Sequence, residues 1–171
     1  MTAASSTRTT PTGHLEATSD GADLVLVRTF RAPIEDVWAS ITESDRLGRW
    51  YGTWEGDGRE GATVAFTWTA EEGQPVVDAT IVRCEAPHAL RVQMASEEGI
   101  WDLEATLAAR DGLTELRFVH HRADLVGVHD VGPGWEFYLD RLEAARADAP
   151  PPDFDPIHAA LGPVYAGMSA T

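Results

Sequence analysis

Two side chains in the sequence are of the types that acid–base chemistry needs, His120 and Asp78. His120 follows Leu116 and Phe118 at steps of two, so on a strand it shares their inward face. An inward histidine is either a proton donor and acceptor near neutral pH or a hydrogen-bonded core group. Asp78 stands in the middle of another predicted strand. It is a candidate acid or base if its face is the concave one, and a surface residue if it is not.

Large aromatic side chains are the second group with a chemical use. Small-molecule sites are usually apolar pockets with a few polar groups, and aromatic rings suit their walls. The candidates for such a lining are Trp50, Trp54, Phe66, Trp68, Trp101, His120, Trp135 and Tyr138. The alternative is that these side chains simply fill the core, since each large ring buries about 150–250 Å².

Three further patterns do not predict a site. Residues 56–61 read G-D-G-R-E-G, but a strand follows them, whereas a dinucleotide loop must open a helix. His120, His121 and His129 form no metal set, because strand neighbours point to opposite faces and no fourth ligand has a suitable spacing. Cys84 is the lone cysteine, so it has no disulfide partner, and its neighbour in sequence does not activate the thiol. We therefore predict no metal and no cofactor.

The composition indicates one acidic domain with tails. The formal net charge of -15 over 171 residues repels nucleic-acid backbones and anionic lipid headgroups. No apolar run reaches about 18 residues, and the N-terminus lacks the apolar stretch of a signal peptide. We predict a cytoplasmic protein with no nucleic-acid partner and no membrane span. Its parts are a disordered N-terminal tail (1–13), a folded domain (14–146) and a proline-containing C-terminal extension (147–171).

A long helix predicted over residues 126–146 must position the candidate groups. Its apolar residues recur at steps of three and four, which is the spacing of one helical face. They are Val128, Val131, Trp135, Tyr138, Leu142 and Ala145. The side predicted to face water holds Glu136, Asp140, Arg141 and Glu143. Pro133 should bend the first turns of this helix.

Strand patterns precede the long helix. Residues 14–19 and 23–31 flank Asp20 and Gly21, a hairpin turn signal. Pro33 then opens a short helix, and a second short helix continues to residue 49. Six more strands are predicted, over residues 51–55, 62–69, 76–84, 89–94, 101–109 and 113–121. Their short connections predict an antiparallel meander.

Signatures at both ends of the predicted domain resemble those of a known superfamily. The first comprises Arg-x-Phe-x-Ala-Pro at residues 28–33, Val-Trp at 37–38 and a tryptophan at 50; the second is Gly-Trp-Glu-x-Tyr-Leu-Asp-x-Leu at 134–142. The sequence resembles the SRPBCC (START-like) superfamily and, within it, the activator of heat-shock-protein ATPase homologue family. The resemblance implies an α+β helix-grip fold. This is a bent antiparallel sheet of about six to seven strands around a long C-terminal helix, with two short helices after the first strand.

The resemblance leaves three functions open, because this superfamily supports several activities on one scaffold. Our leading hypothesis is a protein that binds a small hydrophobic or amphipathic molecule in a cavity between the sheet and the C-terminal helix. The second is an enzyme of cyclase or hydrolase type that uses the same cavity, with His120 and Asp78 as acid–base groups. The third is a co-chaperone that modulates a heat-shock ATPase in the stress response, with a chaperone as its partner. A homodimer is compatible with all three.

Overall fold

The computed structural model describes residues 7–97, 99–122 and 124–171. The described residues form eight strands and four helices. The strands are β1 (His14–Thr18), β2 (Gly21–Phe30), β3 (Thr53–Glu55), β4 (Thr63–Thr67), β5 (Val76–Glu85), β6 (Ala89–Ser96), β7 (Gly99–Arg110) and β8 (Leu113–Arg122). The helices are α1 (Ile34–Thr42), α2 (Ser44–Leu47), α3 (Val128–Arg146) and α4 (Phe154–Ala166).

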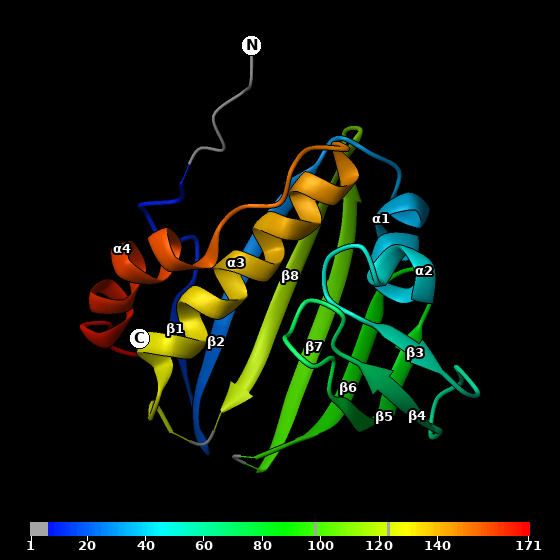
Figure 1. The fold of residues 1–171 in the computed structure, drawn as a ribbon, viewed down its shortest axis with the longest axis horizontal. Helices are drawn as coiled ribbons and strands as arrows, with labels where there is room; N and C mark the ends of the chain where they lie inside the picture. Colours follow the sequence, from blue (N-terminus) through cyan, green and yellow to red (C-terminus); the bar gives the residue numbers. More distant parts are fainter. Residues whose placement is uncertain (1–6, 98, 123) are drawn as a thin grey trace.

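The strands form one antiparallel sheet in the order β1-β2-β8-β7-β6-β5-β4-β3. Strands β3 to β8 are neighbours in sequence order, because short turns join them. Helices α1 and α2 carry the chain from β2 to β3 at the opposite edge (Figure 1). The predicted α+β meander is confirmed. Its eight strands agree with the hairpin and the six further strands that the sequence patterns predict, whereas the family resemblance implied about six to seven strands and short helices after the first strand. The short helices follow β2, the second strand of the hairpin.

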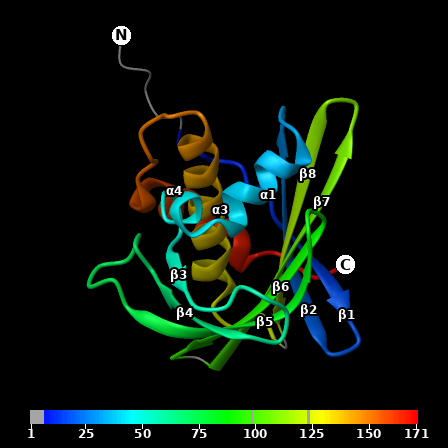
Figure 2. The same ribbon diagram turned by 90° about the vertical axis from the view of Figure 1, so that its right-hand side faces the viewer.

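Helix α3 lies on the concave side of the sheet, which bends around it (Figure 2). Trp135, Leu139 and Leu142 bury their side chains there. The helix begins at Val128, two residues later than predicted, because Gly127 precedes it with a left-handed φ of 73°. Pro133 lies inside the helix as the sequence indicates.

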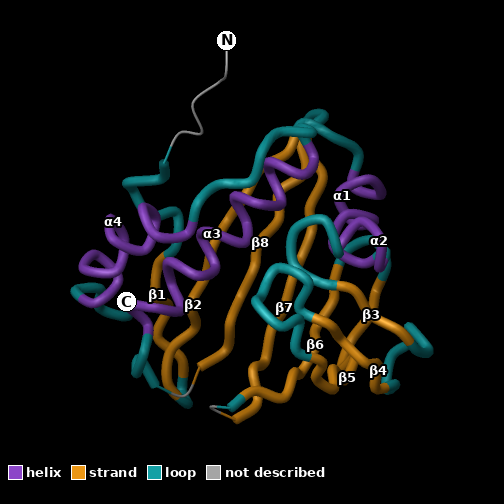
Figure 3. Tube along the Cα trace, viewed as in Figure 1, coloured by secondary structure: helices purple, strands orange, loops and turns teal. Residues whose placement is uncertain are grey.

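The prediction that Glu136 faces water is wrong. Its side chain is fully buried, at 0% exposure. The helical period correctly separates it from Trp135, but a second layer covers the side of α3 on which it lies. That layer is α4, which runs beside α3 at the edge of the molecule (Figure 3). Gly132 on α3 permits this close approach, because a Cβ at that position would collide with the ring of Tyr165 on α4.

Described segments near both ends of the chain contact the domain. The sequence predicts a disordered tail over residues 1–13; residues 1–6 lie outside the described residues, whereas Thr12 and Gly13 bond to Glu136 of α3. At the other end, Thr171 pairs with β1: its carbonyl oxygen accepts from the Ala17 amide at 3.0 Å. The C-terminal extension thus includes a packed helix and a short addition to the sheet edge.

Candidate ligand-binding site

A pocket of about 360 Å³ lies between the two short helices and the sheet. We call it the apolar pocket. Its walls include Trp38, Ile41, Leu47, Trp54, Phe66 and Val92. Thr42 and Glu43 add polar atoms at the end of α1. Among the residues that the structure describes, none from α3 lines this pocket, so it lies beside the long helix rather than under it.

Local sequence explains why apolar groups converge here. On β4 the side chains of Val64 and Phe66 point inward, and on β5 those of Ala79 and Ile81 do so, because strand residues alternate between faces. The apolar stripe of α1 faces them from the other side. The pocket therefore forms where two apolar surfaces diverge instead of meeting.

Trp54 is held in place by hydrogen bonds to the short helices. Its indole N–H donates to the Thr42 carbonyl at 2.8 Å. Its backbone N–H donates to the Ser44 hydroxyl oxygen at 2.8 Å, and that hydroxyl donates to the Trp54 carbonyl at 2.9 Å. These three bonds fix β3 against α1 and α2, so the wall of the apolar pocket is preorganised.

The space directly under α3 is filled by a cluster of aromatic rings. The centroid of Trp135 lies 4.3 Å from that of Phe118, 5.6 Å from that of Tyr51 and 6.0 Å from that of Trp101. Trp135 is only 3% exposed. At this level the interface between sheet and α3 is a packed core, and the open space is displaced to either side of it.

His120 belongs to this packed core. As predicted, it points inward, and it is 2% exposed. Its Nδ1 accepts a hydrogen bond from the indole N–H of Trp135 at 3.1 Å. Burial, with a smaller effect from the Arg122 charge, lowers the pKa of His120 to about 3. A neutral imidazole that already accepts one bond stabilises the core and is poorly placed to exchange protons with a ligand.

Asp78 lies on the other face of the sheet. Its neighbour Ala79 is buried and Asp78 itself is exposed, so the side chain points away from the concave side. The structure therefore does not bring His120 and Asp78 together, and the acid–base pair considered from the sequence is not formed. The run of Asp78, Thr80 and Val82 on one face is a solvent-facing row.

A second pocket, of about 660 Å³, lies at the other side of the aromatic core. Its walls are the rings of Tyr51, Trp68, Trp101 and Tyr138, and its rim carries the carboxylates of Glu71, Glu72 and Glu97. We call it the acidic aromatic pocket. It differs from the apolar pocket both in charge and in its contact with α3, through Tyr138.

The predicted lining residues thus separate into three groups. Two face the apolar pocket, Trp54 and Phe66. Three face the acidic aromatic pocket, Trp68, Trp101 and Tyr138. The other three lie in neither wall and pack in the core, Trp50, Trp135 and His120. Sequence reasoning missed the contribution of α1, whose Trp38 and Ile41 line the apolar pocket.

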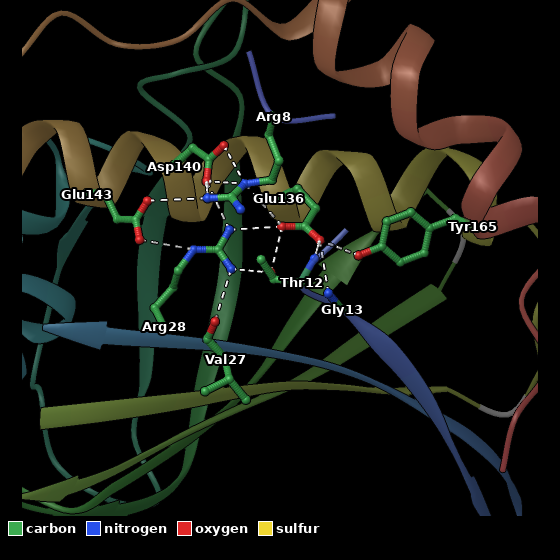
Figure 4. Close-up of polar contacts among 9 residues, drawn as sticks. All are labelled: Arg8, Thr12, Gly13, Val27, Arg28, Glu136, Asp140, Glu143 and Tyr165. Atoms are coloured by element: carbon green, nitrogen blue, oxygen red, sulfur yellow. Dashed lines mark hydrogen bonds and ion pairs between the residues drawn. The ribbon is translucent and has the colours of Figure 1, made fainter. Parts of the chain in front are cut away.

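A buried ionic cluster joins the two signature motifs (Figure 4). The Arg28 guanidinium of β2 donates to Glu136 at 2.9 Å and to Asp140 at 3.0 Å on α3. Arg8 also binds Asp140, at 2.8 Å. Arg28 alternates in phase with Leu24, Leu26 and Phe30, so its side chain also points into the core. Because a buried charge needs a partner, this position in the sequence indicates that a carboxylate lies opposite Arg28.

Glu136 is the centre of this cluster. Its carboxylate accepts from the Tyr165 hydroxyl at 2.6 Å and from the Thr12 and Gly13 amides at 2.6 and 3.0 Å. Burial alone would raise the pKa of Glu136, but the Tyr165 hydrogen bond and the Arg28 charge outweigh it and hold that pKa below its ordinary value. The cluster ties β2, α3, α4 and the N-terminal segment together, so its role is structural.

Across residues 7–97, 99–122 and 124–171, no group of three or more His, Cys, Asp or Glu side chains is arranged to hold a metal ion. None of the helices described is long and apolar enough to cross a membrane.

An open antiparallel sheet that grips a C-terminal helix, with two short helices and a pocket beside it, defines the helix-grip class of α+β proteins. Within that class the chain belongs to the family of Activator of Hsp90 ATPase homolog 1-like proteins, whose model matches residues 31–147. A search of curated proteins finds no match.

Solved structures support the same fold. CalU16 from Micromonospora echinospora is similar at 26% sequence identity and a TM-score of 0.74, over 92% of this chain and 95% of CalU16. A protein from Bordetella parapertussis is similar at 23% identity and a TM-score of 0.73, over 97% of this chain and 96% of the other. DynU16, from the dynemicin biosynthetic locus, has 18% identity and a TM-score of 0.63, over 80% of this chain and 51% of DynU16.

Proposed function

We propose that this protein binds a small hydrophobic or amphipathic molecule in the apolar pocket between α1, α2 and the sheet. The observation that carries the proposal is the pocket itself: about 360 Å³ of space with mostly aliphatic and aromatic walls and a few polar atoms at one end. Ligand sites of proteins commonly span about 300–1,000 Å³ and have this composition.

The physical argument concerns uncovered apolar surface. Each Å² of apolar surface removed from water contributes about 25 cal/mol, so a ligand that fills the pocket gains this free energy without rearranging the packed core. Trp54 is already held by its hydrogen bonds, which limits the ordering cost of binding. The similarity to DynU16, a protein of a biosynthetic locus, supports a small-molecule ligand.

An occlusion experiment tests the proposal. Nile red, a neutral environment-sensitive dye, should bind the folded protein with enhanced emission. Val92→Trp, which adds volume to the pocket wall, should weaken dye binding by about tenfold or more, a loss of roughly 1.4 kcal/mol. Val82→Trp is the matched control, because Val82 is 40% exposed and lines neither pocket. Equal binding by wild type and Val92→Trp would disprove this location.

The enzyme alternative loses its two candidate groups. His120 is occupied with Trp135 and Asp78 is on the opposite face, so a cyclase or hydrolase would need other residues. The co-chaperone alternative rests on the description of the family. If no apolar probe binds and the protein raises the ATPase rate of an Hsp90 chaperone, that alternative replaces the ligand-binding proposal.

A further inference from the structure

The acidic aromatic pocket has features that the proposed function does not use. Trp68 and Trp101 are half-buried, with ring centroids 6.3 Å apart and planes inclined at 63°. Tyr51 and Tyr138 meet edge to face, with centroids 4.9 Å apart. Four rings therefore enclose one space from several directions. The face of an aromatic ring carries negative charge density, so rings that line a pocket can attract a positively charged ligand.

The rim of this pocket carries one sign of charge. Glu71 and Glu72 come from the turn between β4 and β5, and Glu97 comes from the turn between β6 and β7. No arginine or histidine is among the described residues that line the pocket. Among all the residues that the structure describes, none forms an ion pair with Glu71, Glu72 or Glu97. Arg141, which lies on the same helix as Tyr138, is engaged elsewhere: it donates to the Trp50 carbonyl at 2.9 Å, and its guanidinium lies over the Phe137 ring.

The hydroxyls of the two tyrosines in the pocket wall already have hydrogen-bond partners within the protein. Burial raises the pKa of Tyr51 well above its ordinary value, so its hydroxyl stays protonated. Tyr51 is only 7% exposed. Its hydroxyl makes a long hydrogen bond of 3.8 Å to the thioether of Met94, which is a weak acceptor. Tyr138 donates to Glu71, which fixes the turn against α3.

We propose that the acidic aromatic pocket is a second ligand site, separate from the apolar pocket, and that it binds an organic ammonium ion. Aromatic rings attract such a cation through their quadrupoles, and the three glutamates attract it through their charge. A neutral molecule of the same shape would gain only the contact area. An anion would be repelled by the glutamates.

A pair of isosteric probes tests the selectivity for charge. Choline and 3,3-dimethyl-1-butanol have the same shape and differ in one atom, a positively charged nitrogen against a neutral carbon. Choline should bind at least about tenfold more tightly, and added salt should reduce this advantage. The six tryptophan indole N–H signals in an NMR spectrum report the location. Those of Trp68 and Trp101 should shift, whereas those of Trp38 and Trp54 in the apolar pocket should not.

Substitutions at the rim separate this site from general electrostatic attraction. Glu72→Gln with Glu97→Gln should weaken choline binding about fivefold or more and leave 3,3-dimethyl-1-butanol unaffected. The control is Glu35→Gln with Glu115→Gln, which removes the same charge from exposed positions outside the pocket. Equal affinity for the two probes, an equal loss in the control, shifts at Trp38 and Trp54, or no choline binding would each overturn the proposal. None of these outcomes depends on whether Nile red binds the apolar pocket.

Discussion

At the scale of single residues, the buried charged and polar side chains lie beside opposite charges or hydrogen-bond partners, although the Nε of Arg28 has only the charge of Glu143, at 3.4 Å, and no hydrogen bond. Arg28 is 4% exposed and Glu136 is not exposed at all, yet each meets several opposite charges or hydrogen-bond donors. His120 is kept neutral and accepts from Trp135. In each case the cost of removing a polar group from water is offset by a specific bond, so removing the partner should be expensive.

Glu136→Gln should lower the free energy of unfolding by about 3 kcal/mol, because it leaves the buried Arg28 charge undercompensated. Urea denaturation measures this loss. Adding Arg28→Leu should cost much less in the Glu136→Gln protein than in wild type, since the pair acts as a unit. The pKa of Glu136 lies below its ordinary 4.5, so the stability it contributes is present above pH 4.5 and is lost as pH falls through the lowered value.

The exposed pair Asp57–Arg59 provides the control for this prediction. Asp57→Asn should leave the denaturation midpoint unchanged, because surface ion pairs contribute little. A Glu136→Gln protein as stable as wild type would show that the cluster does not hold the fold together.

His120 predicts a second dependence of stability on pH. Its pKa is about 3 in the folded protein and about 6.5 in an unfolded chain, so between these values only the unfolded chain binds the proton. Stability should therefore fall as pH is lowered from 6.5. His120→Gln, which keeps an acceptor for Trp135, should flatten the curve between pH 6.5 and 4.5. His129→Gln should not, because His129 is exposed on the surface. Identical curves for all three proteins would refute the role of His120.

At the scale of elements, α4 converts one side of α3 from surface into interior. Ile157, Leu161 and Tyr165 are at most 1% exposed and face α3 and the ionic cluster. This second layer explains why a glutamate lies in the middle of a buried helical face. The C-terminal extension is therefore part of the folded unit, although it lies beyond the helix that the sheet grips.

A pair of alanine substitutions within α4 tests this docking. Leu161→Ala should cost about 2–5 kcal/mol, because it removes a large side chain from a fully buried position. Val164→Ala, at a position 41% exposed on the same helix, should have little effect and controls for helix propensity. Thermal or urea denaturation of both variants gives the comparison. Equal effects would mean that α4 is not packed as described.

At the scale of the whole molecule, a sheet curved around one helix produces a packed centre with a pocket on each side. Trp135 and its neighbouring rings fill the centre. The apolar pocket opens where α1 and α2 cover the sheet, and the acidic aromatic pocket opens at the strand turns. The net charge of -15 adds a negative field that favours cationic over anionic ligands.

The sequence by itself determined the fold class and the elements up to the long helix, whereas α4 lies in a segment for which it predicted only a proline-containing extension. Turn signals such as Asp20 and Gly21, strand alternation and helical spacing depend on neighbours a few residues apart, so they can be interpreted without coordinates. The two signatures extended that information to the family. The inward direction of His120 also followed from its phase with Phe118 alone.

Only the tertiary structure decided which surfaces are covered and where space remains. The helical or strand repeat of apolar residues shows which residues share a face. The layer that packs against that face is formed by residues far away in the sequence. For this reason the helical period places Glu136 on the water side although α4, β2 and the N-terminal segment bury it, and the strand period alone leaves the direction of Asp78 open. The aromatic residues likewise share an inward direction, yet whether a ring fills the core or lines a pocket depends on the distance to the opposite layer. That distance is set by packing of the whole chain, and no local pattern encodes it.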